Sequence, residues 1–457
     1  MESRTPSALK KLERELTEFL ARMTQGMGRP ERRAAMGNYI TGLLLDGERK
    51  SALPMAARLV QDPSQADAMR QRLIECVSVS PWSDTEMLRR LALELERALP
   101  QLEAFIIDDT GFPKKGVHSV GVHRQYSGTL GRTENCQVGT SLHVAGERGS
   151  GCIGLRLYLP EVWSEDRARC RRAGVPDAIE FRRKWQIALD LLDQALEWGL
   201  KPKTVLADSA YGEGSEFRDG LLERELEYIV GINSTHLVWP PGAQPAAPVR
   251  THRSGRPATR WQDGAHQPLQ AAALVESIPR TRYRKVTWRE GSRGPLSSQF
   301  LFYRVHPAER HTKGRPPGAE HWLICEWRES ESSPRFYLSN LPASLSRRAL
   351  VRRLKLRWRV ERDYQEMKEE LGLDHFEGRT WRGFHHHATL CAVAHGFLAL
   401  RRALFTPQES ALDTADGPPT SPADSDRSHR LLPDVHPGGQ RALTADRHSA
   451  LSGSASL

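Results

Sequence analysis

The sequence lacks several features that would place it in common classes of protein. Its six cysteines include no CxxC pair, so they indicate neither a zinc site nor a disulfide framework. The longest apolar runs, such as Thr41-Gly-Leu-Leu-Leu, are far shorter than the roughly 20 residues of a membrane-spanning helix. Residues 1–6 show no apolar stretch typical of a signal peptide, and no internal repeat is visible. We therefore expect a protein of the reducing cytoplasm with no membrane partner.

Acidic charge is scarce relative to basic charge, because 66 lysines and arginines oppose 56 aspartates and glutamates. The resulting net charge of +10 favours a polyanionic partner such as DNA. The charge is unevenly distributed along the chain. From residue 405 onward, seven acidic residues and four arginines give a net charge of −3, so the preceding body carries +13. A chain of 457 residues with 39% hydrophobic residues is long enough for two or three globular domains.

Residues 1–100 have the hydrophobic periodicity of helices. Leucines and Phe19 recur at helical spacing between Leu9 and Leu20, and Ser83-Asp-Thr-Glu86 is a capping box that opens a helix over 87–99. The arginines of this region favour a DNA-binding role slightly over a solvated helix face. We therefore predict a helical N-terminal region with a possible role in DNA binding.

Residues 101–232 follow a different pattern. The predicted elements are strands at 104–107, 138–144 and 153–159, a helix around 187–196, a strand at 205–207, a helix at 215–225 and a strand at 228–232. Three strands, a helix, a strand, a helix and a strand are the order of an RNase H-like α/β fold. In this arrangement Asp108 and Asp109 end the first strand, and Asp208 follows the fourth.

The remaining sequence divides into three parts. Residues 233–345 alternate Pro/Gly-rich loops with short β-like runs and predict a mostly β insertion in the core. Residues 346–404 predict the helical C-terminal part of the catalytic core, with helices over 346–371 and 384–404. Residues 405–457 are rich in Pro, Ser and Asp, and we predict a disordered tail.

A set of carboxylates suggests phosphoryl-transfer chemistry. Such chemistry needs several carboxylates converging on a pair of Mg²⁺ ions. Asp109 and Asp208 are expected on adjacent strands, and the glutamates between 361 and 370 compete for the third position. At 100° per residue, Arg357, Glu361 and Lys368 share one helix face, whereas Glu366 points away from Glu361. The alternative interpretation of this face is an intrahelical salt-bridge stripe.

Three ordered blocks of sequence carry a family resemblance. The first is Asp108-Asp-Thr-Gly-Phe-Pro-Lys-Lys-Gly116 with the segments that follow it to Val138. The second is Leu206-Ala-Asp208-Ser-Ala-Tyr-Gly212, and the third is Arg357-Trp-Arg-Val-Glu361 continued to Lys368 and Arg379. They resemble the catalytic blocks of bacterial insertion-sequence transposases of the DDE class, most closely the insertion sequence 701 branch. The resemblance spans about residues 20 to 404.

The resemblance implies roles for individual residues. It implies Asp109, Asp208 and Glu361 as catalytic metal ligands, with Glu366 as the fallback for the third. Asp109 is preferred to Asp108 because this class places its first ligand directly before Thr, although the neighbour stays possible. In the related insertion-sequence-four group, a Tyr-Arg-Glu-Lys signature maps onto Leu354, Arg357, Glu361 and Lys368, so the Tyr position departs from the pattern. Arg357 and Lys368 are then expected to bind DNA, as are Lys114 and Lys115.

The function implied is that of a DDE transposase. Such an enzyme cleaves the ends of its own insertion sequence and joins the 3′-OH to target DNA by two-metal phosphoryl transfer, with Mg²⁺ or, as a substitute, Mn²⁺. Its expected partners are double-stranded DNA of the terminal inverted repeats and of the target, and a second subunit in a homodimer on DNA. Its expected location is the bacterial cytoplasm, on the nucleoid when DNA is bound. Two alternatives stay open: an RNase H-like structure-selective DNA nuclease, and an inactive DNA-binding transposon relic.

Overall fold

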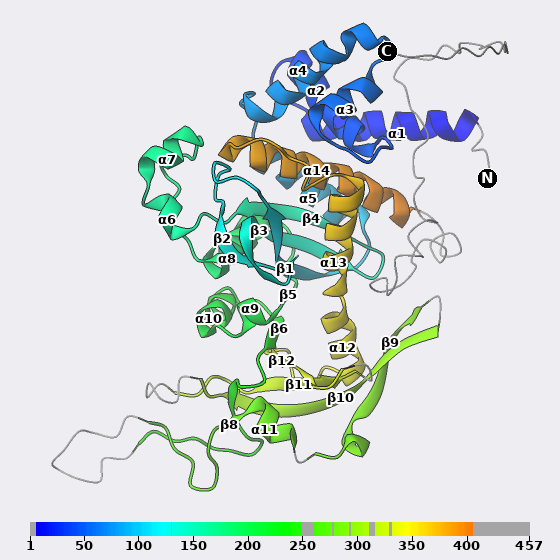
Figure 1. The fold of residues 1–457 in the computed structure, drawn as a ribbon. Helices are drawn as coiled ribbons and strands as arrows, with labels where there is room; N and C mark the ends of the chain where they lie inside the picture. Colours follow the sequence, from blue (N-terminus) through cyan, green and yellow to red (C-terminus); the bar gives the residue numbers. More distant parts are fainter. Residues whose placement is uncertain are drawn as a thin grey trace, which may run out of the picture.

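A computed structural model describes residues 6–128, 130–248, 260–276, 278–291, 294–309, 316–328 and 331–404 (Figure 1). The architecture is mixed α/β: helices gather at one end, and one large sheet extends from them into a β-rich region at the other end. The predicted tail at 405–457 lies outside the described residues. Among the described residues, no helix is long and apolar enough to cross a membrane.

Helices fill the N-terminal region, as predicted. They are α1 (Pro6–Thr24), α2 (Pro30–Leu44), α3 (Ala52–Leu59), α4 (Ala66–Ser78) and α5 (Asp84–Ala98). The start of α5 is fixed by its cap, because the Glu86 amide donates to Ser83 Oγ at 3.0 Å. The buried face of α5 packs on α14 (Trp381–Ala403), where Gly396 leaves room for the side chain of Leu91.

The central part of the sheet has both antiparallel and parallel pairs. Its strands are β1 (Leu102–Pro113), β2 (His123–Ser127), β3 (Arg132–Gly146), β4 (Gly149–Leu157), β5 (Thr204–Ala207) and β6 (Tyr228–Ile232). β3 pairs antiparallel with β1 on one side and with β2 and β4 on the other. β5 is parallel to both β1 and β6, which gives the order β4-β3-β1-β5-β6.

The first strand is longer than predicted. The prediction ended it at 107, but β1 continues to Pro113 because β3 pairs with it along its whole length, as far as Pro113 opposite Cys136. Asp108 and Asp109 therefore lie inside the strand rather than at its end. β2 was not predicted, since its mostly exposed residues show no clear alternation of apolar and polar positions.

The strands of the predicted insertion continue the same sheet. β12 (Arg335–Ser339) pairs antiparallel with β6, and β11 (His321–Trp327), β10 (Gly294–Pro307) and β9 (Arg284–Gly291) follow in order. The short β7 (Leu237–Trp239), β8 (Leu269–Gln270) and α11 (Ala271–Glu276) lie at the far end. The β-rich region and the core are thus joined by backbone hydrogen bonds.

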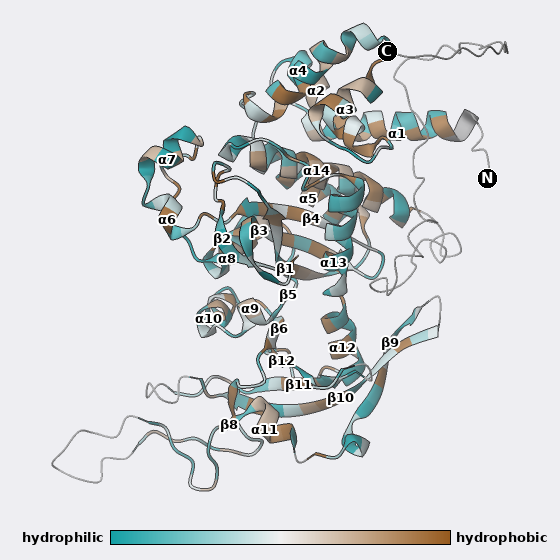
Figure 2. Cartoon of the chain, in the orientation of Figure 1, coloured by the Kyte–Doolittle hydropathy of each residue, from teal (hydrophilic) through white to brown (hydrophobic). Residues whose placement is uncertain are grey.

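Helices cover both faces of the central strands. One face packs on a cluster that includes α8 (Lys184–Glu197) and α14, and the other packs on α12 (Arg347–Lys355) and α13 (Trp358–Gln365). Figure 2 shows the apolar residues gathered on the central strands and their covering helices, whereas the outlying α7 (Arg167–Arg172) is largely hydrophilic. The short α6 (Glu161–Ser164), α9 (Ser209–Gly212) and α10 (Ser215–Glu223) complete the set.

The single helix predicted over 346–371 is broken into parts. Leu356 and Arg357 form a tight turn in which each amide bonds the carbonyl three residues earlier, at 3.0 and 3.3 Å. A continuous helix would point Leu354 and Leu356 in nearly opposite directions, whereas the turn lets both enter the same apolar cluster. Residues Glu366–Glu370 then form one π-helical turn.

Candidate active site

The two adjacent aspartates of β1 point to opposite faces of the sheet, because side chains alternate along a strand. Ile106, two residues before Asp108, packs in the cluster beneath α12 and α13. Ile107, two residues before Asp109, packs in the cluster on the α8 side. Asp108 is therefore on the side of α13, and Asp109 on the side of α8.

Asp108 shares its face with Asp208. The parallel register pairs Ile106 with Leu206, so two residues further along, Asp108 and Asp208 lie on neighbouring strands. Asp208 directly follows β5 and caps α9, where its Oδ1 accepts a hydrogen bond from the Ala210 amide at 2.9 Å. Burial raises the pKa of Asp108 to about 7, and the charge of Asp208 adds to that rise while Arg357 opposes it.

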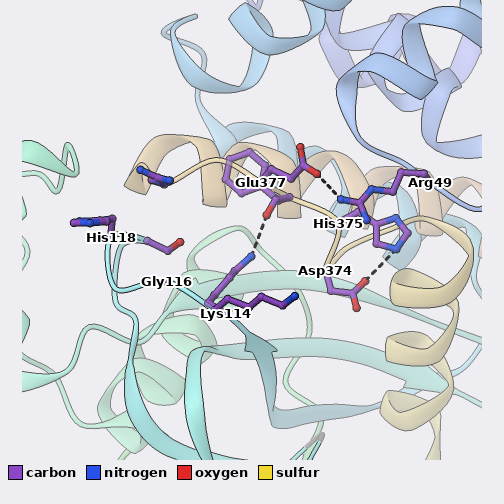
Figure 3. Close-up of a pocket in the computed structure, with 11 residues that line it drawn as sticks. Arg49, Lys114, Gly116, His118, Asp374, His375 and Glu377 are labelled. Carbon is purple, nitrogen blue, oxygen red and sulfur yellow. Dashed lines mark hydrogen bonds and ion pairs between the residues drawn. The ribbon is translucent and has the colours of Figure 1, made fainter.

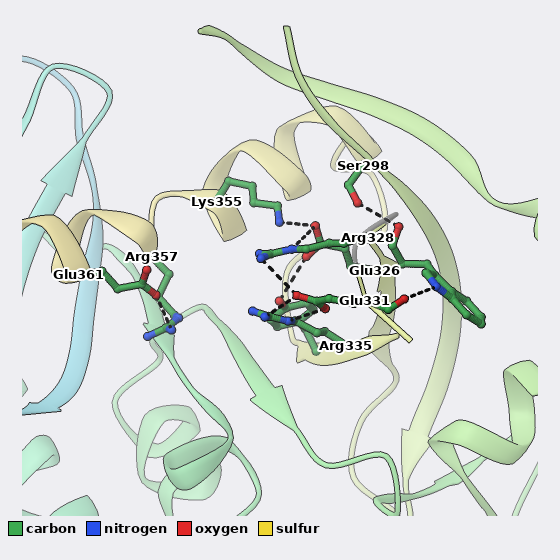
Figure 4. A network of polar contacts seen from close by, with 10 residues as sticks. Ser298, Glu326, Arg328, Glu331, Arg335, Lys355, Arg357 and Glu361 are labelled. Atoms are coloured by element: carbon green, nitrogen blue, oxygen red, sulfur yellow. Dashed lines mark hydrogen bonds and ion pairs between the residues drawn. The ribbon is translucent and has the colours of Figure 1, made fainter. Parts of the chain in front are cut away.

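Arg357 lies among three carboxylates. Its Nη1 is 3.6 Å from Asp108 Oδ2. Its Nη2 is 3.1 Å from Glu361 Oε1, a contact drawn in Figure 4. Burial alone would lower the pKa of Arg357, but Asp108, Glu361 and Asp208 together raise it. One guanidinium thus balances part of the negative charge of all three groups.

Asp109 has different neighbours and is held by hydrogen bonds. Its Oδ1 accepts from Tyr211 OH at 2.5 Å and from Thr140 Oγ1 at 3.0 Å. Its Oδ2 is paired with Lys184 Nζ at 2.8 Å. Both carboxylate oxygens are therefore engaged by side chains of β3, α8 and α9. Sequence reasoning did not identify Tyr211 or Lys184, although the alternation along β1 could have separated the two aspartates.

Glu361 and Glu366, the two candidate ligands from the third sequence block, have different surroundings. Glu361 has a side chain 58% exposed, and Arg357 is its ion-pair partner. Glu366 is buried and pairs with Arg362 at 2.7 Å, Arg402 at 2.6 Å and His395 at 3.2 Å. Burial alone would raise the pKa of Glu366, but these partners hold it well below the usual range. Glu366 is thus committed to internal ion pairs on the side of α14.

The predicted DNA-binding cations do not form one group. Lys368 donates to the carbonyl of Gly111 at 3.1 Å, next to the second half of β1, so it is separate from the Arg357–Glu361 pair. The π-helical turn alters the spacing that placed it on their face. Lys114 Nζ donates to the Phe376 carbonyl at 3.0 Å, and Lys115 is exposed.

A large cavity opens beside Asp208 and Arg357. Its volume is about 930 Å³, and it extends from these two residues to Tyr337, Arg335 and Trp327 of the β-rich region. Nearby, Lys355 at the end of α12 pairs with the fully buried Glu326 of β11 (Figure 4). The ion pair and the shared sheet hold the β-rich wall of the cavity against the carboxylates.

The chemistry of these donors fits a divalent cation. Asp108, Asp208 and Glu361 offer the carboxylate oxygens that Mg²⁺ prefers. Asp108 and Glu361 are both within 4 Å of Arg357, and Asp208 lines the same cavity as Arg357. As they stand in the described part of the chain, no three acidic, histidine or cysteine side chains are close enough together to hold an ion. Glu361, the most exposed of the three, is the carboxylate with most freedom to turn from Arg357.

Comparison with known proteins identifies the class to which this fold and site belong. Residues 22–295 match the family model described as DDE superfamily endonuclease, which covers more than half of the chain. The chain belongs to this family.

A match to a single protein describes the similarity more specifically than the family model does. Over 202 residues the chain is 38% identical to a protein described as a probable transposase for insertion sequence element IS701, from Microchaete diplosiphon. The match covers 43% of this chain and 48% of that relative, so it spans about half of the relative's length. The resemblance predicted from the three sequence blocks is confirmed.

Proposed function

We propose that the chain is a transposase that cleaves the ends of its own insertion sequence and joins each freed 3′-OH to target DNA. The observation that carries the proposal is the set of carboxylates Asp108, Asp208 and Glu361 around Arg357, at the mouth of a large cavity. A cavity of about 930 Å³ leaves room for several nucleotides of a DNA end beside these carboxylates. Membership of the endonuclease family and the likeness to a probable transposase support the same function.

We propose that the core is RNase H-like. In support, β4, β3 and β1 are antiparallel neighbours, β5 and β6 continue parallel to β1, and α8 and α13 cover opposite faces. Asp108 and Asp208 come from neighbouring strands of this core, and Glu361 comes from a helix that crosses them. The β-rich strands between β6 and α12 are the insertion.

For the metal site we propose Asp208 and Glu361, as the resemblance implies, with Asp108 as the first ligand in place of Asp109. The reason is that Asp108 shares a guanidinium with the other two, whereas Asp109 is engaged by Tyr211, Thr140 and Lys184. When bound, a divalent cation would supply Lewis-acid stabilisation of the charge on the phosphoryl oxygens.

The chain's own residues have further roles in this proposal. Arg357 offers a guanidinium whose planar fork suits phosphate, and it lies where the phosphodiester would meet the carboxylates. Asp109, Tyr211 and Lys184 hold β1 against α8 and α9, which fixes the backbone on which Asp108 stands. The cavity positions the DNA end so that the 3′-OH and the target phosphate are held close together.

Strand transfer tests this function. Purified protein is given a labelled element end that already carries a free 3′-OH, together with a supercoiled plasmid and Mg²⁺. We expect joined product from the wild type and none from Asp208→Asn, which keeps the shape of the side chain and removes its charge. Efficient cutting of DNA without joining, under any pairing of ends, would replace this function by that of a structure-selective nuclease. Binding without cutting or joining would indicate an inactive relic.

A further inference from the structure

A second pocket lies beyond the end of β1, outside the set of carboxylates (Figure 3). Its volume is about 320 Å³. Three separate segments line it: the loop at 114–119 after β1, the loop at 374–379 before α14, and Arg49 from the connection between α2 and α3. Nothing in the proposed catalytic chemistry uses this pocket.

Positive charge exceeds negative charge in this pocket. Its cations are Arg49, Lys114, Lys115 and Arg379, and its carboxylates are Asp374 and Glu377, which leaves an excess of two with the imidazoles neutral. Glu377 is paired with Arg49, and the Oδ1 of Asp374 is 3.9 Å from His375 Nε2.

Two of the cations that line the pocket are exposed to solvent. Lys115 and Arg379 are both exposed, and neither side chain makes an ion pair within the described part of the chain. Cations that line the same pocket repel each other unless an anion lies between them.

The loops that carry these cations are fixed before any ligand binds. Asn135 Nδ2 donates to the carbonyls of Lys114 at 2.6 Å and Gly116 at 3.0 Å, and the Lys114 amide donates to the Asn135 carbonyl at 2.9 Å. The Val120 amide donates to the Arg379 carbonyl at 3.0 Å, which joins the two loops. Lys114 Nζ donates to the Phe376 carbonyl, and no carboxylate of the described residues pairs with it. A preorganised group of cations of this kind favours a phosphate.

We propose that this pocket binds a backbone phosphate of the DNA duplex whose end lies at the carboxylates. The identity of the polymer rests on the proposed function. Six residues of extended strand separate Asp108 from Lys114, a distance of about 20 Å at most. Since one strand of DNA carries a phosphate every 3.4 Å along the axis, the bound phosphate is within about six base pairs of the cleaved end.

Salt dependence of binding tests the pocket without requiring catalysis. A labelled duplex of the element end is titrated in EDTA with the wild type, Lys115→Gln, Arg379→Gln and the double variant. The matched control is Lys201→Gln, an exposed lysine before β5, at the end of that strand opposite to Asp208. Because one phosphate is bound, the double variant should reduce the slope of log K against log salt by about 0.9, and each single substitution by no more than that. Slopes equal to that of Lys201→Gln would overturn the proposal.

Neutral phosphate analogues locate the contact. Duplexes with a single methylphosphonate are scanned from the cleaved end inward. We expect the wild type to lose affinity at a position within about six base pairs of the end, and the double variant to be insensitive at that same position. Equal sensitivity of both proteins at every position would place the phosphate elsewhere.

Inorganic phosphate distinguishes a small-anion site from a DNA site. Millimolar phosphate could raise the Tm of the wild type but not of the double variant, while the salt dependence of DNA binding is the same for all variants. In that case the pocket binds a small phosphate ligand, and the proposal fails. Because every arm measures binding without Mg²⁺, loss of the strand-transfer function would not by itself change these outcomes. The two proposals can therefore fail independently.

Discussion

Asp108 and Asp109 are chemically identical neighbours with different surroundings. Asp108 faces Arg357 at 3.6 Å, in a space shared with Asp208 and Glu361. Asp109 is bonded by a tyrosine, a threonine and a lysine, each from a different element. A cation that bound Asp109 would have to displace Lys184, whereas a cation beside Asp108 would meet two further carboxylates.

Separate substitution of the two aspartates tests this difference. We expect Asp108→Asn to abolish DNA cleavage, since it removes a charge from the proposed ligand set. Asp109→Asn should retain cleavage at a level reduced by about 10- to 100-fold, as expected when an outer partner of a metal site is removed. Cleavage rates are measured on variants whose Tm shows that they are folded. Inactive Asp109→Asn together with active Asp108→Asn would return the first ligand to Asp109.

Arg357 gives a second prediction at this scale, because its guanidinium and a bound cation would balance the same carboxylates. In Arg357→Gln these carboxylates repel one another with no compensating charge, so the metal-free protein should be less stable. Mg²⁺ should then raise the Tm of Arg357→Gln by more than it raises that of the wild type. Differential scanning fluorimetry with and without Mg²⁺ measures this, with the exposed Arg348→Gln as the control. Equal shifts in all three proteins would separate Arg357 from the metal site.

At the scale of elements, α13 is held by a buried network on the side opposite to Glu361. Asp363 accepts from Ser150 Oγ at 2.6 Å and pairs with His143 Nδ1 at 2.7 Å, which joins α13 to β3 and β4. Burial alone would lower the pKa of His143, but Cys152 and Asp363 raise it to about 10, so this imidazole is charged near neutral pH. The network fixes the helix from which Glu361 and Arg357 project.

Removal of one partner from this network should be costly. Asp363→Ala leaves the charged His143 buried without its carboxylate, so we expect a loss of about 3 to 5 kcal/mol in the free energy of unfolding. Glu369→Ala, an exposed carboxylate one helical turn beyond Gln365, should change stability by less than about 0.5 kcal/mol. Urea unfolding at pH 7 measures both. A small effect of Asp363→Ala would mean that α13 is held by its apolar contacts alone.

The elements also show which features the sequence could predict. The strand Tyr228–Ile232 and the helix ended by Gly199 follow from local apolar patterns and from a glycine with φ of +90°. The extension of β1 to Pro113 depends on pairing with β3, and the turn at Leu356 depends on packing against β1 and β5. Both are contacts between distant parts of the chain, which local periodicity does not contain. The same limit applies to the choice between Asp108 and Asp109.

At the scale of the whole molecule, one sheet connects the carboxylates to the β-rich region. The strands of the predicted β-rich insertion continue this sheet from β6 through β12. The wall of the cavity is therefore coupled to the strands that carry Asp108 and Asp208. The order of sequence blocks identified the family, whereas the continuity of the sheet required long-range pairing and could not be predicted from the sequence.

The number of subunits at work is a property of the whole assembly. Under the proposed function two element ends are joined to one target, so we expect a symmetric dimer on DNA in which each subunit joins one end.

Mixing of inactive and active subunits tests this dimer. When wild-type protein is mixed with an equal amount of Asp208→Asn before DNA is added, about half of the dimers should be mixed if subunits pair at random. Products with one joined end should then increase relative to products with two. Gel separation of the labelled plasmid products measures this ratio. The control is wild-type protein diluted with buffer. The same product ratio in the mixture and in this control would show that subunits act singly. That result would contradict the dimer but not the joining of a single end by each chain.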